Sequence, residues 1–275
     1  HLFTVLKTYK GLIYKYKINM NINISNKKII LIGGNGLLGS QYTKFLQNKV
    51  KSLSIIDLSS NKINDSLLKK NVKFYKSNLK NIPDFKKKIK LAIKDMNGVD
   101  VLINNAALTS EFSINKKKIF NEFDIKAWQE SIDITLTGTY LACVNVLPTM
   151  IKQQNGQIIN ISSHYGIVSP NHNIYNNEDF NCPISYSVAK TAIIGLTKWL
   201  ATKYAKNGIR INSISPGGVK NKQSLSFIKK YSDLNPMKRM ARKDEFNGIL
   251  HYLISDESSY VVGHNFVIDG GSSVW

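Results

Sequence analysis

Short apolar runs alternate with helix-length amphipathic segments along almost the whole chain. The run at 28–32 (KIILI) is short and apolar after its first residue, and it ends at glycines, which is typical of a strand buried on both faces. Runs of this kind occur at 28–32, 52–56, 72–75, 99–104, 157–161, 209–214 and 265–268. Between them, the spacing of apolar residues predicts helices at 37–48, 84–96, 126–153, 184–206 and 244–255, with Gly138 and Pro148 weakening the middle of the longest.

This alternation predicts the fold class. Repeated strand–helix–strand units with short connections need a parallel sheet covered on both faces and joined by right-handed crossovers. We therefore predict an α/β fold with a doubly wound, mostly parallel seven-stranded sheet in a single domain. Residues 1–19 lack acidic side chains and contain no apolar run long enough to span a bilayer. We interpret them as an irregular N-terminal extension preceding a domain at 20–275.

The charge is strongly basic, with 38 Lys+Arg against 18 Asp+Glu and a formal net charge of +20. Such a balance suggests nucleic acid or anionic membrane as a partner. Only Arg210, Arg239 and Arg242 are arginines, however, and guanidinium groups do most of the specific reading of bases and phosphates. We interpret the charge as a compositional bias and expect no nucleic-acid and no membrane partner. Cys143 and Cys182 show neither metal nor disulfide spacing, which favours a cytoplasmic location.

A glycine-rich turn follows the first predicted strand. Read from Gly34, the segment 34–39 is G-x-G-x-x-G between a strand and a helix. Glycines permit a tight turn and close approach of a pyrophosphate, whose charge the helix N-terminus favours. Packing alone also produces such turns, but Asp57 closes the next strand, where a carboxylate accepts hydrogen bonds from ribose hydroxyls and repels a 2′-phosphate. The sequence therefore predicts NAD binding, with NADP the less favoured cofactor.

Tyr186 and Lys190 lie one helical turn apart at the start of a predicted helix. We expect the ammonium to lower the pKa of the phenol towards working pH, as an acid/base tyrosine requires. Taken alone, a Y-x-x-x-K pair is more often a surface pair. Three further motifs change this interpretation: 104–107, 162–163 and 216–218 each follow a predicted strand at the carboxyl edge, where doubly wound folds bind ligands.

Together these motifs resemble the short-chain dehydrogenase/reductase family, over residues 27–275 and including the ending 267–271 (VIDGG). The resemblance implies an NAD(P)-dependent oxidoreductase that transfers hydride between nicotinamide C4 and an alcohol or carbonyl carbon of a small polar substrate. It implies assembly as a homodimer or homotetramer, Tyr186 as acid/base, Lys190 on the nicotinamide ribose and Ser163 on the substrate oxygen. The implied cofactor-binding residues are Gly33, Asn35, Gly36, Leu37, Leu38, Gly39, Asp57, Asn78, Asn105, Ala106, Ala107, Tyr186, Lys190, Pro216, Gly217, Gly218 and Val219.

The chain departs from the family pattern in three places. Leu37 stands where the second turn glycine is usual, with Gly36 just before it. Thr135 replaces an asparagine that in many relatives supports a proton relay from Lys190 to solvent, which puts that relay in doubt. The segment from His164 to Cys182 is longer than is typical, so we expect it to shape substrate specificity, unless it is only a surface loop. His164 and His172 within it lack a convincing third ligand, and we predict no metal site.

The segment 221–240 is predicted to form a lid over the substrate. Its cations suit an anionic or sugar-like substrate, although a solvated face explains them equally well: Lys222, Lys229, Lys230, Lys238 and Arg239. The long loop and the ending 269–275 are similar to a branch associated with bacterial surface-sugar pathways. Trp275 is expected to pack, at a subunit contact or elsewhere. Two alternatives stay open: an NAD-retaining epimerase or dehydratase, which the spacing of Gly33, Gly36 and Gly39 also suits, and a non-catalytic dinucleotide-binding scaffold.

Overall fold

The computed structural model describes residues 22–59, 68–108, 125–176 and 181–275, so the N-terminal extension expected at 1–19 lies outside the described residues. Its centre is a seven-stranded sheet in the order β3-β2-β1-β4-β5-β6-β7, and every pairing is parallel. The strands are β1 (Lys28–Ile32), β2 (Ser52–Asp57), β3 (Val72–Lys76), β4 (Val101–Asn104), β5 (Gly156–Ile161), β6 (Ile209–Pro216) and β7 (Asn265–Ile268). The predicted doubly wound α/β fold is confirmed.

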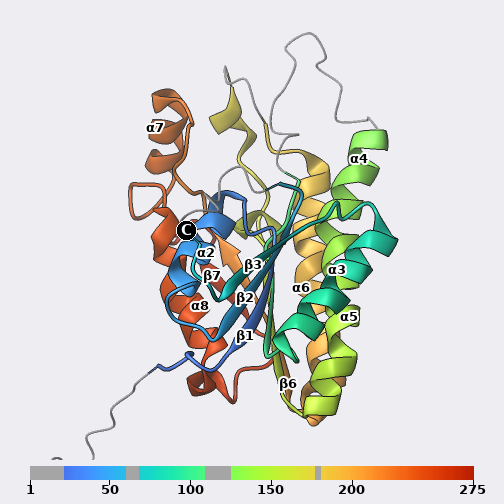
Figure 1. Ribbon diagram of the computed structural model, residues 1–275. Helices are drawn as coiled ribbons and strands as arrows, with labels where there is room; N and C mark the ends of the chain where they lie inside the picture. The colour runs from blue at the N-terminus through green and yellow to red at the C-terminus, as the bar shows by residue number, and fades with distance from the viewer. Residues whose placement is uncertain (1–21, 60–67, 109–124, 177–180) are drawn as a thin grey trace, which may run out of the picture.

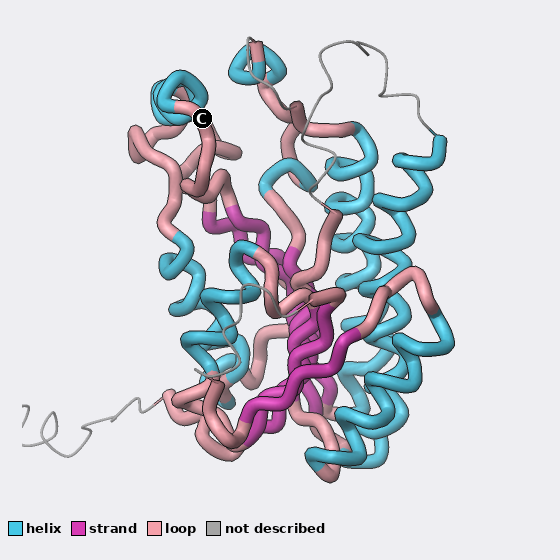
Figure 2. The backbone as a smooth tube through the Cα atoms, turned by 45° about the horizontal axis from the view of Figure 1, so that its top comes forward, coloured by secondary structure: helices cyan, strands magenta, loops and turns pink. Residues whose placement is uncertain are grey.

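Helices cover both faces of the sheet, which is why the central strands are apolar on both sides (Figures 1 and 2). One face carries α3 (Ile82–Met96), α4 (Ile125–Ile132), α5 (Gly138–Gln153) and α6 (Ile184–Tyr204). The other carries α2 (Leu37–Leu46) and α8 (Asn247–Ile254). Each face has its own core cluster. The strand order reverses between β1 and β4, and doubly wound folds bind ligands at the carboxyl ends of strands beside such a reversal.

The helix predicted at 126–153 is interrupted just before Gly138 and continues through Pro148. A π-helical turn at Asp133–Thr137 separates α4 from α5, while Pro148 lies inside α5. Gly138 allows close packing, because a Cβ there would lie 2.7 Å from Leu79 Cδ2. The whole stretch Ile125–Gln153 is long and apolar enough to cross a membrane by length and composition. Half of its most apolar window is buried against the rest of the molecule, as in the core helix of a soluble protein.

One other predicted helix and one predicted strand have different bounds in the structure. The segment 244–255 divides into a short 3₁₀ turn, Lys243–Phe246, and α8. The fourth strand starts at Val101, because Asp100 is used as a cap: its Oδ2 accepts a hydrogen bond from the Lys28 backbone N–H at 2.8 Å.

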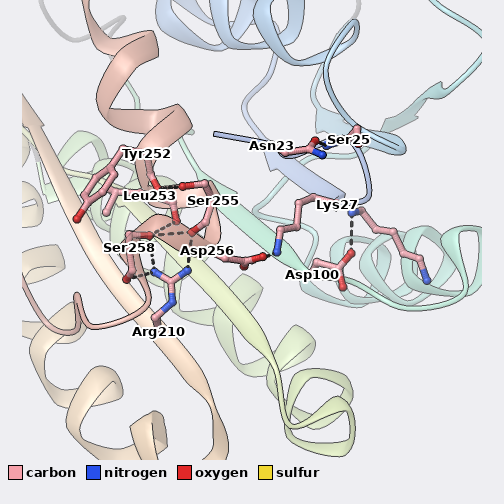
Figure 3. A network of polar contacts seen from close by, with 11 residues as sticks. Asn23, Ser25, Lys27, Asp100, Arg210, Tyr252, Leu253, Ser255, Asp256 and Ser258 are labelled. Atoms are coloured by element: carbon pink, nitrogen blue, oxygen red, sulfur yellow. Dashed lines mark hydrogen bonds and ion pairs between the residues drawn. The ribbon is translucent and has the colours of Figure 1, made fainter. Parts of the chain in front are cut away.

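A polar network ties the amino edge of the sheet to the end of α8 (Figure 3). Arg210 in β6 donates from Nη1 to the Ser258 carbonyl and hydroxyl oxygens, both at 2.6 Å, and from Nη2 to the Ser255 carbonyl at 3.0 Å. Lys27, just before β1, forms an ion pair of 2.7 Å with Asp256. This edge is therefore fixed by side chains and leaves the opposite, carboxyl edge free to build a site.

Candidate active site

A cavity of about 900 Å³ opens at the carboxyl edge of the sheet. Every site residue predicted from the sequence lines it, with the exception of Gly39. The predicted residues at the cavity are Gly33, Asn35, Gly36, Leu37, Leu38, Asp57, Asn78, Asn105, Ala106, Ala107, Ser163, Tyr186, Lys190, Pro216, Gly217, Gly218 and Val219. Motifs spread over 186 positions of the chain thus meet in one space, because parallel strands all end at the same edge.

The glycine turn is shaped by close backbone contacts. Gly33 has a φ of +78°, and a Cβ there would lie 2.6 Å from backbone atoms of Ala106, so a side chain is excluded by conformation and by space. A Cβ on Gly39 would lie 2.0 Å from the Gly33 carbonyl oxygen, so Gly39 permits the helix to pack against the turn and does not line the cavity. Gly36 caps α2 without a side chain, so the first amides of that helix face the cavity uncapped. This cradle fits a pyrophosphate, which needs close backbone approach and a helix N-terminus.

Asp57 is held at the end of β2 with its carboxylate beside this turn. Its Oδ2 accepts from the Asn35 backbone N–H at 2.8 Å and its Oδ1 from the Leu58 N–H at 2.6 Å. A carboxylate oxygen has two acceptor sites, so each oxygen keeps one for a further donor. Across the cavity, Asn105 Nδ2 donates to the Gly33 carbonyl at 2.8 Å and fixes the turn to the end of β4. The remaining acceptor sites of Asp57 fit the hydroxyl groups of a dinucleotide ribose, which are hydrogen-bond donors.

The three predicted catalytic side chains lie together. Tyr186 is hydrogen-bonded to Ser163 through their side chains. Lys190 is 2% exposed, its Nζ donates to the Ile161 carbonyl at 2.7 Å, and the same atom lies 5.6 Å from the centre of the Tyr186 ring. Helix α6 therefore presents the phenol and the amine to the same end of the cavity, as their spacing predicted.

The expected lowering of the pKa of Tyr186 by Lys190 is not found. Burial raises the pKa of Tyr186 to about 12, although the hydrogen bond from Ser163 opposes this rise. Burial also lowers the pKa of Lys190 to about 7. The prediction of a lowered tyrosine pKa assumed a fully charged lysine, and a lysine removed from water is charged only in part at neutral pH. At this site the loss of hydration on burial therefore affects the pKa of Tyr186 more than the attraction between the phenolate and Lys190 does.

Thr135, which replaces the family's asparagine, lies in the π-helical turn and is fully buried. Its Oγ1 accepts a hydrogen bond from the Leu108 N–H at 3.2 Å, and its carbonyl accepts from Thr139 Oγ1 at 2.7 Å. The hydroxyl therefore supports the loop after β4. A role for Thr135 in a proton relay stays a prediction.

The long segment after Ser163 packs onto the predicted lid. Ile174, Tyr175 and Cys182 form a cluster with Phe227 and Tyr231 of α7 (Leu225–Asp233). A hydrogen bond of 2.6 Å joins the same two parts, from Lys230 Nζ to the Asn176 carbonyl. The segment is thus more than a surface loop over the residues described, which leave out 177–180.

The sequence predicted that the segments 164–182 and 221–240 lie at the substrate, but not which of their side chains line the cavity. The lining side chains from these segments are mainly aromatic: His164, Tyr165, Tyr175, Phe227, Tyr231 and Met240. The hydroxyl groups of Tyr175 and Tyr165 lie 3.2 Å apart and join the long segment to the end of β5. The density of aromatic residues in the long segment was the only available signal, and it did not say which rings turn inwards.

Most of the lid's cations are engaged away from the cavity. Lys229 and Arg239 form ion pairs with Asp233 at 2.7 Å and Glu245 at 2.6 Å. Lys238 donates to the Asp233 carbonyl at 2.9 Å. Of the five, Lys222 alone lines the cavity, so the lid charges give little support to an anionic substrate. In the described part of the chain, His, Cys, Asp and Glu form no group of three or more suited to a metal.

The doubly wound sheet and its glycine-lined cavity define a dinucleotide-binding α/β protein. Comparison with known proteins gives its family. A family model described as Enoyl-(Acyl carrier protein) reductase matches residues 52–273. The chain belongs to the short-chain dehydrogenase/reductase family, and it is an oxidoreductase acting on CH–OH or C=O groups.

Named relatives span several substrates. The trans-4-hydroxycyclohexanecarboxylate dehydrogenase of Sinomonas cyclohexanicum is 34% identical over 66% of this chain and 63% of its own length. A 3-oxoacyl-[acyl-carrier-protein] reductase of Thermotoga maritima is 28% identical over 91% and 99%. The post-translational flagellin modification protein A of Campylobacter coli is 30% identical over 90% and 98%. A short-chain dehydrogenase from Leptospira borgpetersenii, crystallised with bound NAD⁺, has a TM-score of 0.81 at 27% identity, over 93% of this chain and 96% of that one.

Proposed function

We propose that this protein reduces a carbonyl group of a small polar, sugar-like substrate, or oxidises the matching alcohol, with NAD as cofactor and Tyr186 as the general acid/base. The observation that carries the proposal is the meeting of Ser163, Tyr186 and Lys190 in the cavity that the glycine turn also lines. A nicotinamide cofactor bound there supplies the hydride. The protein's own part is to orient the substrate and to move one proton.

The protonation state of the site favours reduction. Because burial raises the pKa of Tyr186 to about 12, the phenol carries its proton at neutral pH and is ready to give it to a carbonyl oxygen. As the carbonyl carbon gains hydride, its oxygen takes the phenol proton, and Ser163 donates a second hydrogen bond to that oxygen. A proton then returns to Tyr186 from solvent. Lys190, hydrogen-bonded to the Ile161 carbonyl, lies beside the ring and stabilises the phenolate that forms in between.

Asp57 supports NAD over NADP. Its carboxylate lines the cavity beside the turn and holds the Asn35 and Leu58 amides, so it cannot move away from an added phosphate without breaking both bonds. A 2′-phosphate next to it would bring two like charges together. Asp57 accepts ribose hydroxyls instead.

A sugar-like substrate is supported by the substrate end of the cavity. Aromatic faces alternate there with a few polar atoms, a common arrangement for binding rings that carry both C–H faces and hydroxyl groups. The similarity over nearly the full length to a flagellin modification protein points the same way. An epimerase or dehydratase that retains NAD, and a scaffold without catalysis, are the alternatives that the experiment below excludes.

The exposed apolar residues of α4, α5 and α6 support assembly as a homodimer or homotetramer. Ile125, Tyr140, Ile184, Val188 and Trp199 are each between 41% and 71% exposed on the outer helical layer. Trp275 is 73% exposed and contacts Lys238, so packing within the chain does not account for it. Two free, buried cysteines suit the reducing cytoplasm that we propose as the location.

The test is Tyr186→Phe, with Tyr140→Phe on the exposed part of α5 as the matched control. Loss of the acid should lower kcat/KM about 10²- to 10⁴-fold on a panel of keto-sugars, polyols and keto-acids, while NADH binding, followed by nicotinamide fluorescence, stays unchanged. No turnover by wild type or by Tyr186→Phe, with NADH bound by both, would support the scaffold. Product formation without net change in NADH would support the epimerase or dehydratase.

A further inference from the structure

His164 is a buried ring at the substrate end of the cavity, immediately after Ser163 in the chain. It is 5% exposed, its ring lies 3.9 Å from that of Tyr165, and Tyr231 meets it edge-on at 6.4 Å. These contacts fix the plane of the imidazole. The position of both ring nitrogens is therefore determined by packing.

The hydrogen bonding of His164 determines its tautomer. Its Nδ1 lies 3.2 Å from the carbonyl oxygen of Pro216, and a carbonyl only accepts, so Nδ1 carries the proton. Burial lowers the pKa of His164, although the Pro216 carbonyl and the charge of Asp269 oppose this, so the ring is neutral at pH 7. The other nitrogen, Nε2, is then a bare lone pair.

Nε2 is also without a partner in the described part of the chain, and it is not among the side-chain atoms sealed away from solvent there. Since His164 lines the cavity and Nε2 is not sealed from solvent, this acceptor is available to a substrate bound there. An acceptor in that position binds a hydroxyl or another donor. It repels a carboxylate or a second carbonyl, which have only lone pairs to offer.

We propose that His164 is a specificity-determining residue that accepts a hydrogen bond from a hydroxyl group of the substrate other than the reacting carbonyl or alcohol group. It thereby selects hydroxy-ketones and sugars over simple ketones and keto-acids. This inference rests on the proposed function, since it assigns the substrate class of the same site. It assigns His164 no part in the proton transfer, which stays with Tyr186.

The experiment compares two ketones that differ by one hydroxyl, 3-hydroxybutan-2-one and butan-2-one, in wild type and in His164→Asn. In asparagine the amide nitrogen is separated from Cβ by the same number of covalent bonds as Nδ1 is in histidine. The hydrogen bond to the Pro216 carbonyl is therefore kept, while the Nε2 acceptor is lost. His164→Gln is the converse variant, with an acceptor at the distance of Nε2. The intrinsic reactivity of each ketone cancels when the ratio of kcat/KM values is compared between variants.

In His164→Asn, the ratio of kcat/KM for the hydroxy-ketone to kcat/KM for butan-2-one should fall about tenfold, which corresponds to the loss of one hydrogen bond. His164→Gln should keep most of the preference. NADH binding and thermal unfolding report whether each variant folds and keeps the turn at Pro216.

An unchanged ratio in His164→Asn, or an equal loss on both ketones, overturns the role of His164 and leaves the oxidoreductase standing. Wild type that binds NADH but reduces no carbonyl compound contradicts the proposed function itself. The two failures are therefore told apart by the wild type alone.

Discussion

The stability of the cofactor-free protein should depend on pH through Lys190. This side chain is almost wholly buried, and burial lowers its pKa to about 7 from an ordinary value of 10.5. Between these values the folded lysine is neutral and the unfolded one is charged, so unfolding takes up a proton. Raising the pH through this window therefore stabilises the folded state. One pKa unit corresponds to about 1.4 kcal/mol, so the contribution between pH 7 and 9.5 is about 3 kcal/mol.

The perturbation is Lys190→Met, which keeps an unbranched side chain, shorter by the terminal atom, and removes the titrating group. The free energy of unfolding would be measured by urea denaturation of wild type and variant, without cofactor, at intervals from pH 6 to 9.5. Subtracting one from the other cancels the titration of all other groups. The free energy of unfolding of the wild type, relative to that of the variant, should increase by about 3 kcal/mol from pH 7 to 9.5 and stay nearly constant between pH 6 and 6.5.

Lys198→Met, on the exposed side of the same helix, is the control for replacing a lysine by methionine. A difference between wild type and Lys190→Met that does not change with pH would show that Lys190 stays charged when buried. The finding that desolvation outweighs attraction between Lys190 and Tyr186, and with it the preference for reduction, would then be refuted.

Two further substitutions test the cofactor preference and the polar network at the amino edge of the sheet. Asp57→Ala removes the charge beside the ribose site, so the ratio of NADP to NAD affinity should rise roughly tenfold in fluorescence titrations; an unchanged ratio would remove Asp57 from cofactor selection. Arg210→Ala leaves the Ser255 and Ser258 acceptors without their donor and should lower the free energy of unfolding by about 2–3 kcal/mol. The control is Arg242→Ala, which removes a side chain that is 66% exposed and should lower the free energy of unfolding by less than about 1 kcal/mol. Equal effects of the two substitutions would show that the network in Figure 3 adds no stability.

The strands and the gathering of the motifs were predictable from the sequence because both depend on local patterns. A run such as 28–32 has few alternatives to a buried strand, and β1 occupies these residues. Once strands alternate with helices, parallel pairing follows, and the residues after each strand meet at one edge. Ser163, Asn105 and Pro216 needed no further information to be placed together.

What the sequence did not predict depends on contacts between distant segments. The ring of Tyr175 lines the cavity because α7 packs against it, and no local pattern pairs those segments. Lys230 of the lid donates to the Asn176 carbonyl, 54 residues away in the chain, which a count of charges cannot show. The sign of the change in the pKa of Tyr186 depends on burial, which follows from the whole fold.

The buried polar groups of α6 connect the architecture to the chemistry. Asn104 in β4 donates to Asn160 Oδ1 in β5 at 2.8 Å, and Asn160 donates to Thr197 Oγ1 on α6 at 2.9 Å. Thr197 lies seven residues after Lys190, two helical turns along the same face, and Lys190 is itself bonded to the Ile161 carbonyl of β5. Two hydrogen bonds to β5, at Asn160 and at Ile161, thus fix how α6 lies along the sheet, because any slip would leave buried polar atoms without partners. The same register places Tyr186 at the cavity. The buried lysine and amides therefore hold the phenol at the place where its proton is needed.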